Sequence, residues 1–223
     1  MNKIIAGVAV VLGLGIAAFW YTSSSGTQAT NAPVLSPISS AEAQEIDTSG
    51  VMEITMGDPN ASITVIEYAS YTCPHCARFH EDVFKDLKTN YIDTGKINFV
   101  YREVYFDRLG LWAGMLARCA GPDGYFDVAN LLYEQQADWA RAGDPADVAT
   151  ALRRLGLSAG MSGEQIDACL QDGDKAQAMV AVFQQNAEAD NVRATPSFFI
   201  NGEPYSNMSY ADFSALLNEM LGE

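Results

Sequence analysis

Two cysteines separated by two residues, in the run Cys73-Pro74-His75-Cys76, are the residues of this chain best suited to chemistry. The run follows a β-branched segment and opens an amphipathic one at 79–87, so we expect it at the start of a helix. Unpaired backbone N–H groups and the helix dipole favour a thiolate at that position. Two thiols one helical turn apart can close and reopen a small disulfide, and the pattern therefore predicts thiol–disulfide exchange.

The spacing also assigns a role to each residue of the run. Cys76 lies at helical steps from the apolar residues that follow it, so we expect it on the buried face as the resolving thiol. Cys73, one turn earlier, is predicted to lie at the exposed mouth and to be the attacking thiolate. Pro74 fits the first helical turn, where its missing N–H is not needed. His75 can donate a hydrogen bond or a positive charge to the Cys73 thiolate, which would make the disulfide more oxidising.

Other interpretations of the Cys-x-x-Cys pattern remain open. A zinc site is one, because His75 and His80 stand five positions apart, although the other two cysteines are remote in sequence. An inert structural disulfide is another. A c-type haem would need a histidine directly after the second cysteine, where this chain has Ala77. We predict redox chemistry with no metal and no cofactor.

Glu67 interrupts the nearly continuous apolar run at 63–68, which is typical of a central strand covered on both faces. A buried carboxylate is costly unless it is paired, protonated or useful. Glu67 is therefore either an edge-facing side chain in water or a proton acceptor for Cys76 during exchange.

Cys119 and Cys169 are the remaining cysteines, and both lie in a stretch with helical periodicity. In an exported protein, two cysteines that remain after the first pair favour a structural disulfide. Two buried free thiols and a second redox centre are the alternatives. Neither residue has the helix-start pattern of the first pair.

The composition and the N-terminus limit the choice of partners and compartment. The net charge of −15, from 13 basic and 28 acidic residues, argues against nucleic acid as a partner. An apolar run at 4–21 after Lys3 is typical of a signal peptide (1–21) or an uncleaved membrane anchor. Residues 22–49 are rich in Ser, Thr, Ala and Pro and are predicted to be a flexible linker. Either N-terminal interpretation places the remainder outside the cytoplasm, where a catalytic disulfide can persist.

The order of predicted elements is a βαβ unit, a helical stretch and a ββα unit. Strands are expected at 52–56, 63–68, 97–105, 197–201 and 203–205, and helices at 73–91, 109–120, 126–136, 145–155, 162–170 and 175–191. Asn201-Gly202 is a strong hairpin signal between the last two strands. Ser209 is expected to cap a final helix with a clear apolar face.

The segments 66–76 (IEYASYTCPHC) and 194–202 (ATPSFFING) together resemble the DsbA-like branch of the thioredoxin superfamily. The resemblance implies an α/β thioredoxin fold in two parts, 50–107 and 192–223, with an inserted all-helical domain at 108–191. It further implies that Cys73 forms the mixed disulfide, that Cys76 resolves it, and that Pro196 is a cis-proline with Thr195 beside the sulfurs.

The same resemblance implies a location in the periplasm of a Gram-negative bacterium, free or anchored through 4–21. Family members accept electrons from cysteines of unfolded or newly exported proteins and pass them to a quinone-linked membrane partner. We expect a monomer, because the linker is too polar to supply a dimerisation segment.

Two departures from the family leave details open. Several members carry a glutamate where this chain has His80, which either adds positive charge below about pH 6.5 or is a surface histidine. Thr195 is shared with isomerase and reductase relatives, so the direction of electron flow is not decided. A dithiol oxidase is the leading prediction, a disulfide isomerase or reductase is the alternative, and a peptide-binding holdase is the third candidate.

Overall fold

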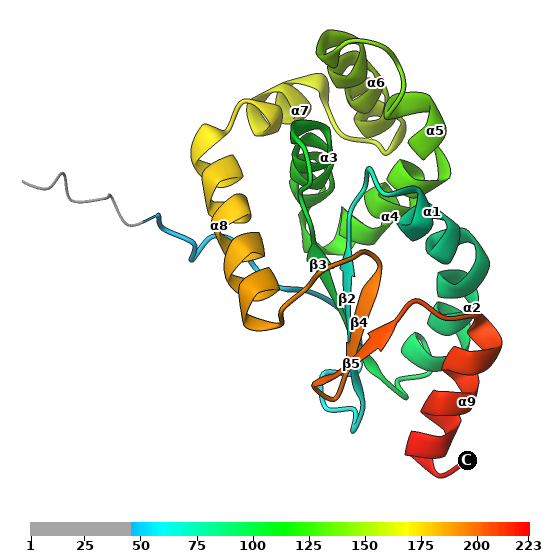
Figure 1. Cartoon of the computed structure of the whole chain (residues 1–223). Coiled ribbons are helices and arrows are strands. Elements are labelled where there is room, and N and C mark those ends of the chain that lie inside the picture. Colours follow the sequence, from blue (N-terminus) through cyan, green and yellow to red (C-terminus); the bar gives the residue numbers. More distant parts are fainter. Residues whose placement is uncertain (1–45) are drawn as a thin grey trace, which may run out of the picture. The chain divides into compact units, whose positions relative to one another are not determined.

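The centre of the fold is a five-stranded mixed sheet with the order β1-β3-β2-β4-β5 (Figure 1). The computed structural model describes residues 46–223, so the predicted signal or anchor and nearly all of the predicted linker lie outside the described residues. The strands are β1 (Ile54–Gly57), β2 (Thr64–Ala69), β3 (Asn98–Glu103), β4 (Ser197–Ile200) and β5 (Glu203–Ser206). Strands β2 and β3 pair in parallel, and the other neighbours in this sheet pair antiparallel. This arrangement confirms the predicted βαβ and ββα units.

Side chains of the strands alternate between two covered faces. On one face Phe198 of β4 packs against Phe79 of α1 (Pro74–Phe79) and Phe213 of α9 (Tyr210–Leu221), with ring centroids 4.8 Å and 5.2 Å away. On the other face the Tyr68 hydroxyl reaches the end of α8 (Gly173–Ala189). In Figure 1, α8 accordingly lies on the opposite side of the sheet from α1 and α9. Glu67 pairs with Phe198 across the strands and so shares the α1 face.

The helix that begins at the cysteine pair differs from the regular α-helix that the sequence predicts for 73–91. It continues from α1 through η1 (His80–Phe84), α2 (Lys85–Leu87) and η2 (Lys88–Ile92), and both η segments are π-helical. The wider π turn places two adjacent residues on the buried side, as with Val83 and Phe84 and again with Tyr91 and Ile92. Apolar periodicity alone does not distinguish such a turn from an α-helical one.

A block of helices stands between β3 and β4. It comprises α3 (Arg108–Cys119), α4 (Gly121–Glu134), α5 (Gln136–Trp139), α6 (Pro145–Ser158), α7 (Gly163–Leu170) and α8. Two predicted boundaries were wrong, because α4 begins five residues early and α6 continues through Gly156. A Cβ at Gly156 would lie 2.8 Å from Ile166 Cδ1 and 2.9 Å from Leu116 Cδ1. This glycine therefore permits close helix packing and does not end the helix.

Two local predictions are confirmed. Asn201 and Gly202 both have positive φ, 50° and 88°, as a two-residue hairpin turn with the twist of its strands requires. The Ser209 side chain accepts a hydrogen bond from the Asp212 N–H at 3.2 Å and caps α9.

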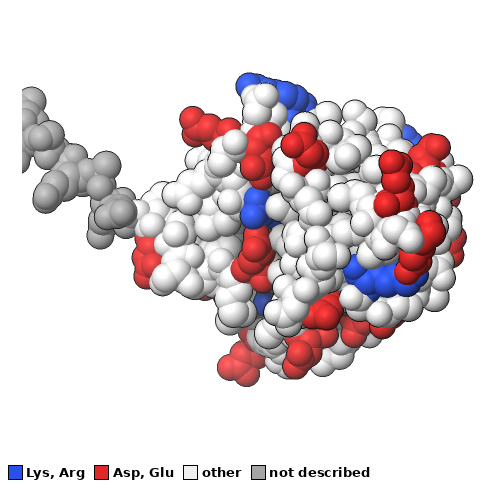
Figure 2. Space-filling view, turned by 90° about the horizontal axis from the view of Figure 1, so that it is seen from below, with Lys and Arg blue, Asp and Glu red and all other residues white. Residues whose placement is uncertain are grey.

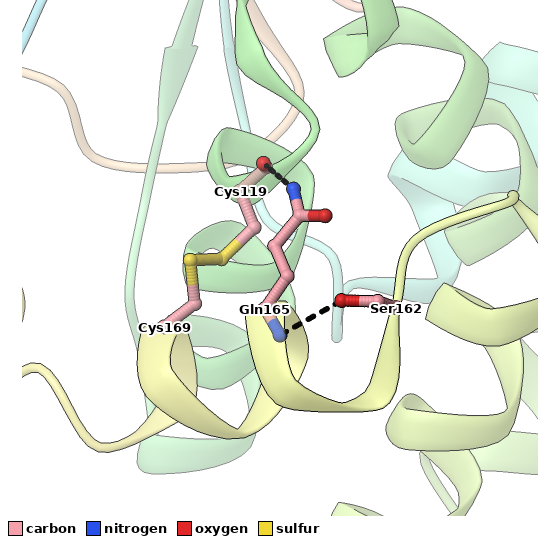
Figure 3. Close-up of a disulfide and its surroundings, with 4 residues drawn as sticks. All are labelled: Cys119, Ser162, Gln165 and Cys169. Atoms are coloured by element: carbon pink, nitrogen blue, oxygen red, sulfur yellow. Dashed lines mark hydrogen bonds between the residues drawn. A yellow bond between two sulfur atoms is a disulfide. The ribbon is translucent and has the colours of Figure 1, made fainter.

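The predicted disulfide between Cys119 and Cys169 is also confirmed (Figure 3). It joins the end of α3 to α7, with the two Cα atoms 6.1 Å apart. Gln165 strengthens the same junction by donating from its side-chain amide to the Cys119 carbonyl at 2.8 Å. Because α7 is short and fully buries only Ile166, the cross-link adds a covalent tie to an element with little buried surface of its own.

The acidic composition is visible on the surface. Figure 2 shows one face of the molecule, on which carboxylate side chains are spread widely and the basic side chains lie in separate small groups. Within residues 46–223 no helix combines the length and the apolar character needed to cross a membrane.

Candidate active site

The cysteine pair lies where the predicted helix begins. Cys73 is the N-cap residue of α1, with extended backbone angles, and its carbonyl accepts from the Ala77 N–H at 3.2 Å. Pro74 occupies the first turn. Both cysteines are free thiols. Cys73 is 9% exposed and Cys76 is 1% exposed, so their order is as predicted, but Cys73 does not lie at an open mouth.

The surroundings of Cys73 favour its thiolate. Its Sγ lies 3.5 Å from the Thr195 carbonyl oxygen, to which the protonated thiol donates, and this one contact favours the thiol. Other contacts outweigh it. The pKa of Cys73 is lowered to about 5, chiefly by a hydrogen bond from the Cys76 thiol. The Thr195 side chain and the backbone N–H groups of Cys76 and His75 add to this effect, against the desolvation that would raise the pKa. The result is an acidic thiol at a helix start.

His75 acts on Cys73 through its backbone, contrary to the sequence prediction of a contact from the imidazole. The ring is exposed, and its Nδ1 lies 2.8 Å from Arg78 Nη2, which donates to it. The correction has a simple cause, because a side chain that leaves the first turn next to an arginine at i+3 meets that arginine on the helix surface.

Cys76 and Glu67 form the buried part of the site. Desolvation raises the pKa of Cys76, and the Cys73 thiol and the Glu67 charge raise it further. Glu67 is 3% exposed, and desolvation, followed by the charge on Cys73, raises its pKa to about 8. Glu67 is therefore not the water-facing carboxylate of the first interpretation. It is mostly a protonated acid at neutral pH, electrostatically coupled to both sulfurs.

The loop before β4 completes the site. The Thr195–Pro196 peptide bond is cis, as predicted. A groove of about 800 Å³ runs from His75 past Thr195 and Pro196 and along β4 and β5. Its lining includes the aromatic rings of Phe199 and Tyr205.

The comparison with known proteins agrees with this geometry. A thioredoxin family model matches residues 49–219. The chain belongs to the DsbA-like branch of the thioredoxin superfamily. The solved structure of α-DsbA1 from Wolbachia pipientis is similar with a TM-score of 0.70 and 28% identity, over 76% of this chain and 91% of that one.

Two curated relatives agree with this placement. A Rickettsia typhi protein named as a candidate protein-disulfide oxidoreductase is 34% identical over 170 residues, which are 76% of this chain and 62% of the relative. The chain thus spans less than two thirds of that protein. Disulfide bond formation protein D of Bacillus subtilis is 27% identical over 173 residues and is matched over 72% of each chain.

His80 occupies a buried position in this DsbA-like protein, and both expectations for it were wrong. Its ring stacks between Phe84 and Tyr133, with centroids 4.6 Å and 4.8 Å away, and its Nε2 lies 2.7 Å from the Asn130 amide oxygen. Desolvation lowers the pKa of His80 to about 4. The residue is therefore a neutral part of the core at physiological pH.

The alternative zinc site is not formed by the two histidines, because His75 is exposed and His80 is buried. Among residues 46–223 no three His, Cys, Asp or Glu side chains are grouped so that they could hold a metal ion.

The sequence did not reveal how the helical block holds the loop before Cys73. Gln136 of α5 donates from Nε2 to the carbonyl oxygens of Tyr71 and Cys73, at 2.8 Å and 3.0 Å. On the other side, Thr72 Oγ1 donates to Asp107 Oδ2 at 2.8 Å, and Asp107 also caps α3. A glutamine at the start of a short helix carries no motif, so no local signal could have identified it.

Proposed function

We propose that this chain is an exported dithiol oxidase that introduces disulfides into other proteins through Cys73 and Cys76. The observation that carries this proposal is the lowered pKa of Cys73, about 5, beside a buried thiol of raised pKa. A stable thiolate favours the reduced form of the enzyme, and its disulfide is therefore an oxidant. The branch to which the chain belongs comprises disulfide oxidoreductases, in agreement with this chemistry.

The reaction has two exchange steps. A substrate thiolate attacks Cys73 Sγ of the enzyme disulfide, a mixed disulfide forms, and Cys76 leaves as a thiolate. Protonated Glu67 can give its proton to Cys76, whose own raised pKa favours the thiol. The second thiolate of the substrate then attacks the substrate sulfur of the mixed disulfide. The substrate disulfide forms, and Cys73 leaves as a thiolate. The substrate loses two electrons and the enzyme gains them.

The substrates in this proposal are cysteine-containing segments of unfolded or newly exported proteins. The groove beside Thr195 and Pro196 is long enough along β4 and β5 to receive an extended segment, and its aromatic lining suits apolar side chains. We place the protein in the periplasm of a Gram-negative bacterium, as a monomer that is free or anchored through residues 4–21. A quinone-linked membrane protein would accept the two electrons from Cys73 and Cys76.

The acidity of Cys73 also supports a second candidate, a disulfide isomerase. Relative to thioredoxin, whose nucleophile has a pKa near 7, a value near 5 stabilises the reduced form by about 2 kcal/mol at pH 7. This corresponds to a reduction potential about 50 mV above the thioredoxin value, or about −220 mV. Such a potential lies between that of a reductase and that of a strong oxidant such as DsbA, at about −120 mV.

The deciding experiment is the reduction potential of Cys73–Cys76 in glutathione buffers, combined with the rate at which the protein oxidises a reduced two-cysteine peptide. An oxidase requires a potential of about −220 mV or higher and rapid oxidation of the peptide, whereas the same potential with slow net oxidation would favour the isomerase. A potential near about −270 mV would assign the protein as a reductase. A Cys73→Ala, Cys76→Ala double variant is the control, and retained suppression of aggregation by it would support the holdase instead.

A further inference from the structure

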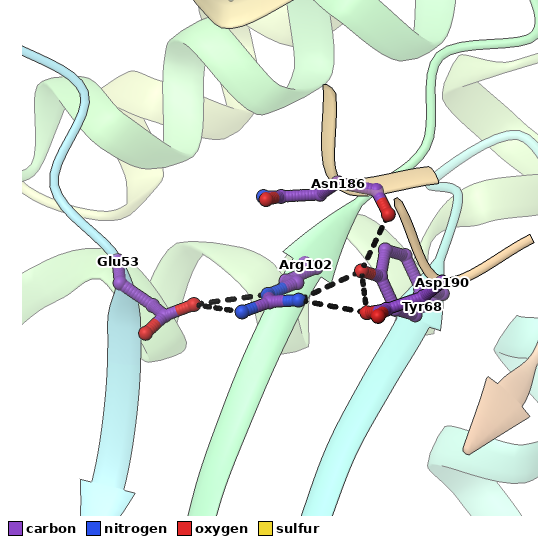
Figure 4. A network of polar contacts seen from close by, with 5 residues as sticks. All are labelled: Glu53, Tyr68, Arg102, Asn186 and Asp190. Carbon is purple, nitrogen blue, oxygen red and sulfur yellow. Dashed lines mark hydrogen bonds and ion pairs between the residues drawn. The ribbon is translucent and has the colours of Figure 1, made fainter. Parts of the chain in front are cut away.

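A cluster of polar side chains surrounds Tyr68 (Figure 4). Tyr68 follows Glu67, which pairs with Phe198, so the Tyr68 side chain lies on the opposite face of the sheet from Phe198. The centre of this group, which we call the Tyr68 cluster, consists of Tyr68, Arg102 and Asp190. The Tyr68 hydroxyl donates to Asp190 Oδ2 at 2.5 Å, and Arg102 Nη1 donates to the Tyr68 oxygen at 2.8 Å and to Asp190 Oδ2 at 3.0 Å. Glu53 bonds the far side of the Arg102 guanidinium at 2.8 Å and 2.9 Å.

The cluster is a shielded ion pair and not a flexible surface contact. Tyr68 is fully buried, and the side chains of Arg102 and Asp190 are only 21% and 30% exposed. Desolvation, and then the bond to Asp190, raise the pKa of Tyr68, so its hydroxyl remains a donor. The same hydroxyl also lies 3.1 Å from the Asn186 carbonyl oxygen, one turn before the end of α8. Tyr68 therefore fixes the last turn of this helix to the sheet.

Tyr68 contacts the residues on both sides of the 191–196 segment. Asp190 is the C-cap residue of α8 before it, and the Tyr68 side chain holds that carboxylate. At the other end Ser197 begins β4 and pairs with Tyr68 across the antiparallel strands. Thr195 lies within this short segment and meets Cys73 Sγ with its carbonyl oxygen. A loop held at both ends by one buried residue has little freedom to move its members.

We propose that the Tyr68 cluster is a positioning element of the redox site, which holds Thr195 against Cys73 from the opposite face of the sheet. The inference rests on the proposed function, since it describes how the same site is tuned. A purely structural role would tie α8 to the sheet and stabilise the fold without any effect on the sulfur chemistry.

Tyr68→Phe removes the hydroxyl and keeps the buried ring, and Asp190→Asn keeps the shape and removes the charge. Either change removes or weakens a bond that holds Asp190 at one end of the 191–196 segment. The Thr195 side chain, whose hydrogen bond lowers the pKa of Cys73, is then held less firmly beside the sulfur. Because the hydrogen bond from the Thr195 side chain to the Cys73 thiolate is weakened, we expect the pKa of Cys73 to rise by about one unit. The equilibrium constant with glutathione should change about tenfold, which is about 30 mV.

Absorbance of the thiolate at 240 nm, titrated between pH 3 and pH 9, measures this shift on the reduced protein. Glu53→Gln is the matched control, because Glu53 bonds the same arginine but makes no hydrogen bond to α8 or to the 191–196 segment within the described part of the chain. Each variant is also followed by thermal unfolding, so that an unfolded variant is recognised.

A second comparison isolates the role of Thr195. In a Thr195→Val background the hydroxyl that lowers the pKa of Cys73 is absent, so Tyr68→Phe should shift the titration no further. The proposal is overturned if Tyr68→Phe and Asp190→Asn shift the pKa of Cys73 no more than Glu53→Gln does. An equal shift with and without the Thr195→Val change would overturn it as well. The titration needs no substrate, so a wild-type protein that fails to oxidise peptides would reject the proposed function alone.

Discussion

Glu67 offers the sharpest test of the energetics of the site, because its burial is useful for chemistry but costly for folding. The carboxyl lies on the α1 face of the central strand, and desolvation, then the Cys73 charge, raise its pKa from the ordinary 4.5 to about 8. Glu67→Gln keeps the size and removes the charge. We therefore expect the variant to be more stable than the wild type near neutral pH and slower in exchange.

The magnitude follows from proton linkage. An acid whose pKa is higher in the folded protein destabilises it above the unfolded-state pKa, and the penalty grows until the pH reaches the folded-state pKa. At pH 7 the penalty is about 3 kcal/mol, from ~2.5 pKa units at 1.36 kcal/mol each. It is near zero at pH 4 and reaches about 5 kcal/mol above pH 8. The stability that Glu67→Gln gains should be smaller in the oxidised protein, because no Cys73 thiolate then raises the pKa of Glu67.

The assay is urea denaturation, followed by tryptophan fluorescence, of the wild type and Glu67→Gln at pH 4, 5.5, 7 and 8.5. The free energy of unfolding of Glu67→Gln should exceed that of the wild type by an amount that grows with pH, from near zero at pH 4 to about 3 kcal/mol at pH 7. Glu81→Gln is the control, because Glu81 is an exposed carboxylate of the same helical segment and should give no such trend. A gain that is the same at pH 4 and pH 7 would refute the reasoning. A loss of stability at pH 7 would show that Glu67 is ionised and stabilising.

Three further changes test other parts of the molecule. Gln136→Ala leaves the Tyr71 carbonyl oxygen without its donor and the Cys73 carbonyl with the Ala77 N–H alone, so urea denaturation should show a loss of about 1–3 kcal/mol, with faster alkylation of Cys73; an unchanged alkylation rate would show that the loop keeps its position without this contact. The low pKa of His80 means that the folded protein resists protonation of the ring, so this residue costs stability as the pH falls from 6.5 towards 4, by about 2–3 kcal/mol at pH 4.5. A His80→Gln variant does not titrate and should lack that loss, and equal acid sensitivity in both proteins would exclude His80 as its source. Replacing Cys119 and Cys169 together by alanine should cost about 4 kcal/mol on the loop-entropy model, measured by urea denaturation, with no change in the Cys73 thiolate titration; a shifted titration would mean that the cross-link also acts on the redox site.

The sequence alone determined those features that depend on neighbours along the chain. The Cys73–Cys76 spacing identified the chemistry, because thiols one turn apart at a helix start are sufficient for disulfide exchange. The turn at 201–202 and the cap at Ser209 were correct because their backbone angles and hydrogen bonds are satisfied within a few residues. The count of cysteines favoured the pairing of Cys119 with Cys169 but left two free thiols open, and the structure shows the disulfide.

Only the tertiary structure decided what surrounds those residues. Glu67 and His80 each had two open interpretations, because the burial of a side chain depends on which distant element packs over it. His80 became a core residue when α4 placed Asn130 and Tyr133 against it. Gln136 reaches the carbonyl of Cys73 across 63 positions of chain, and no local pattern records such a contact. Spacing fixes which atoms can react, whereas desolvation and hydrogen bonds from remote segments fix their pKa values and hence the direction of the reaction.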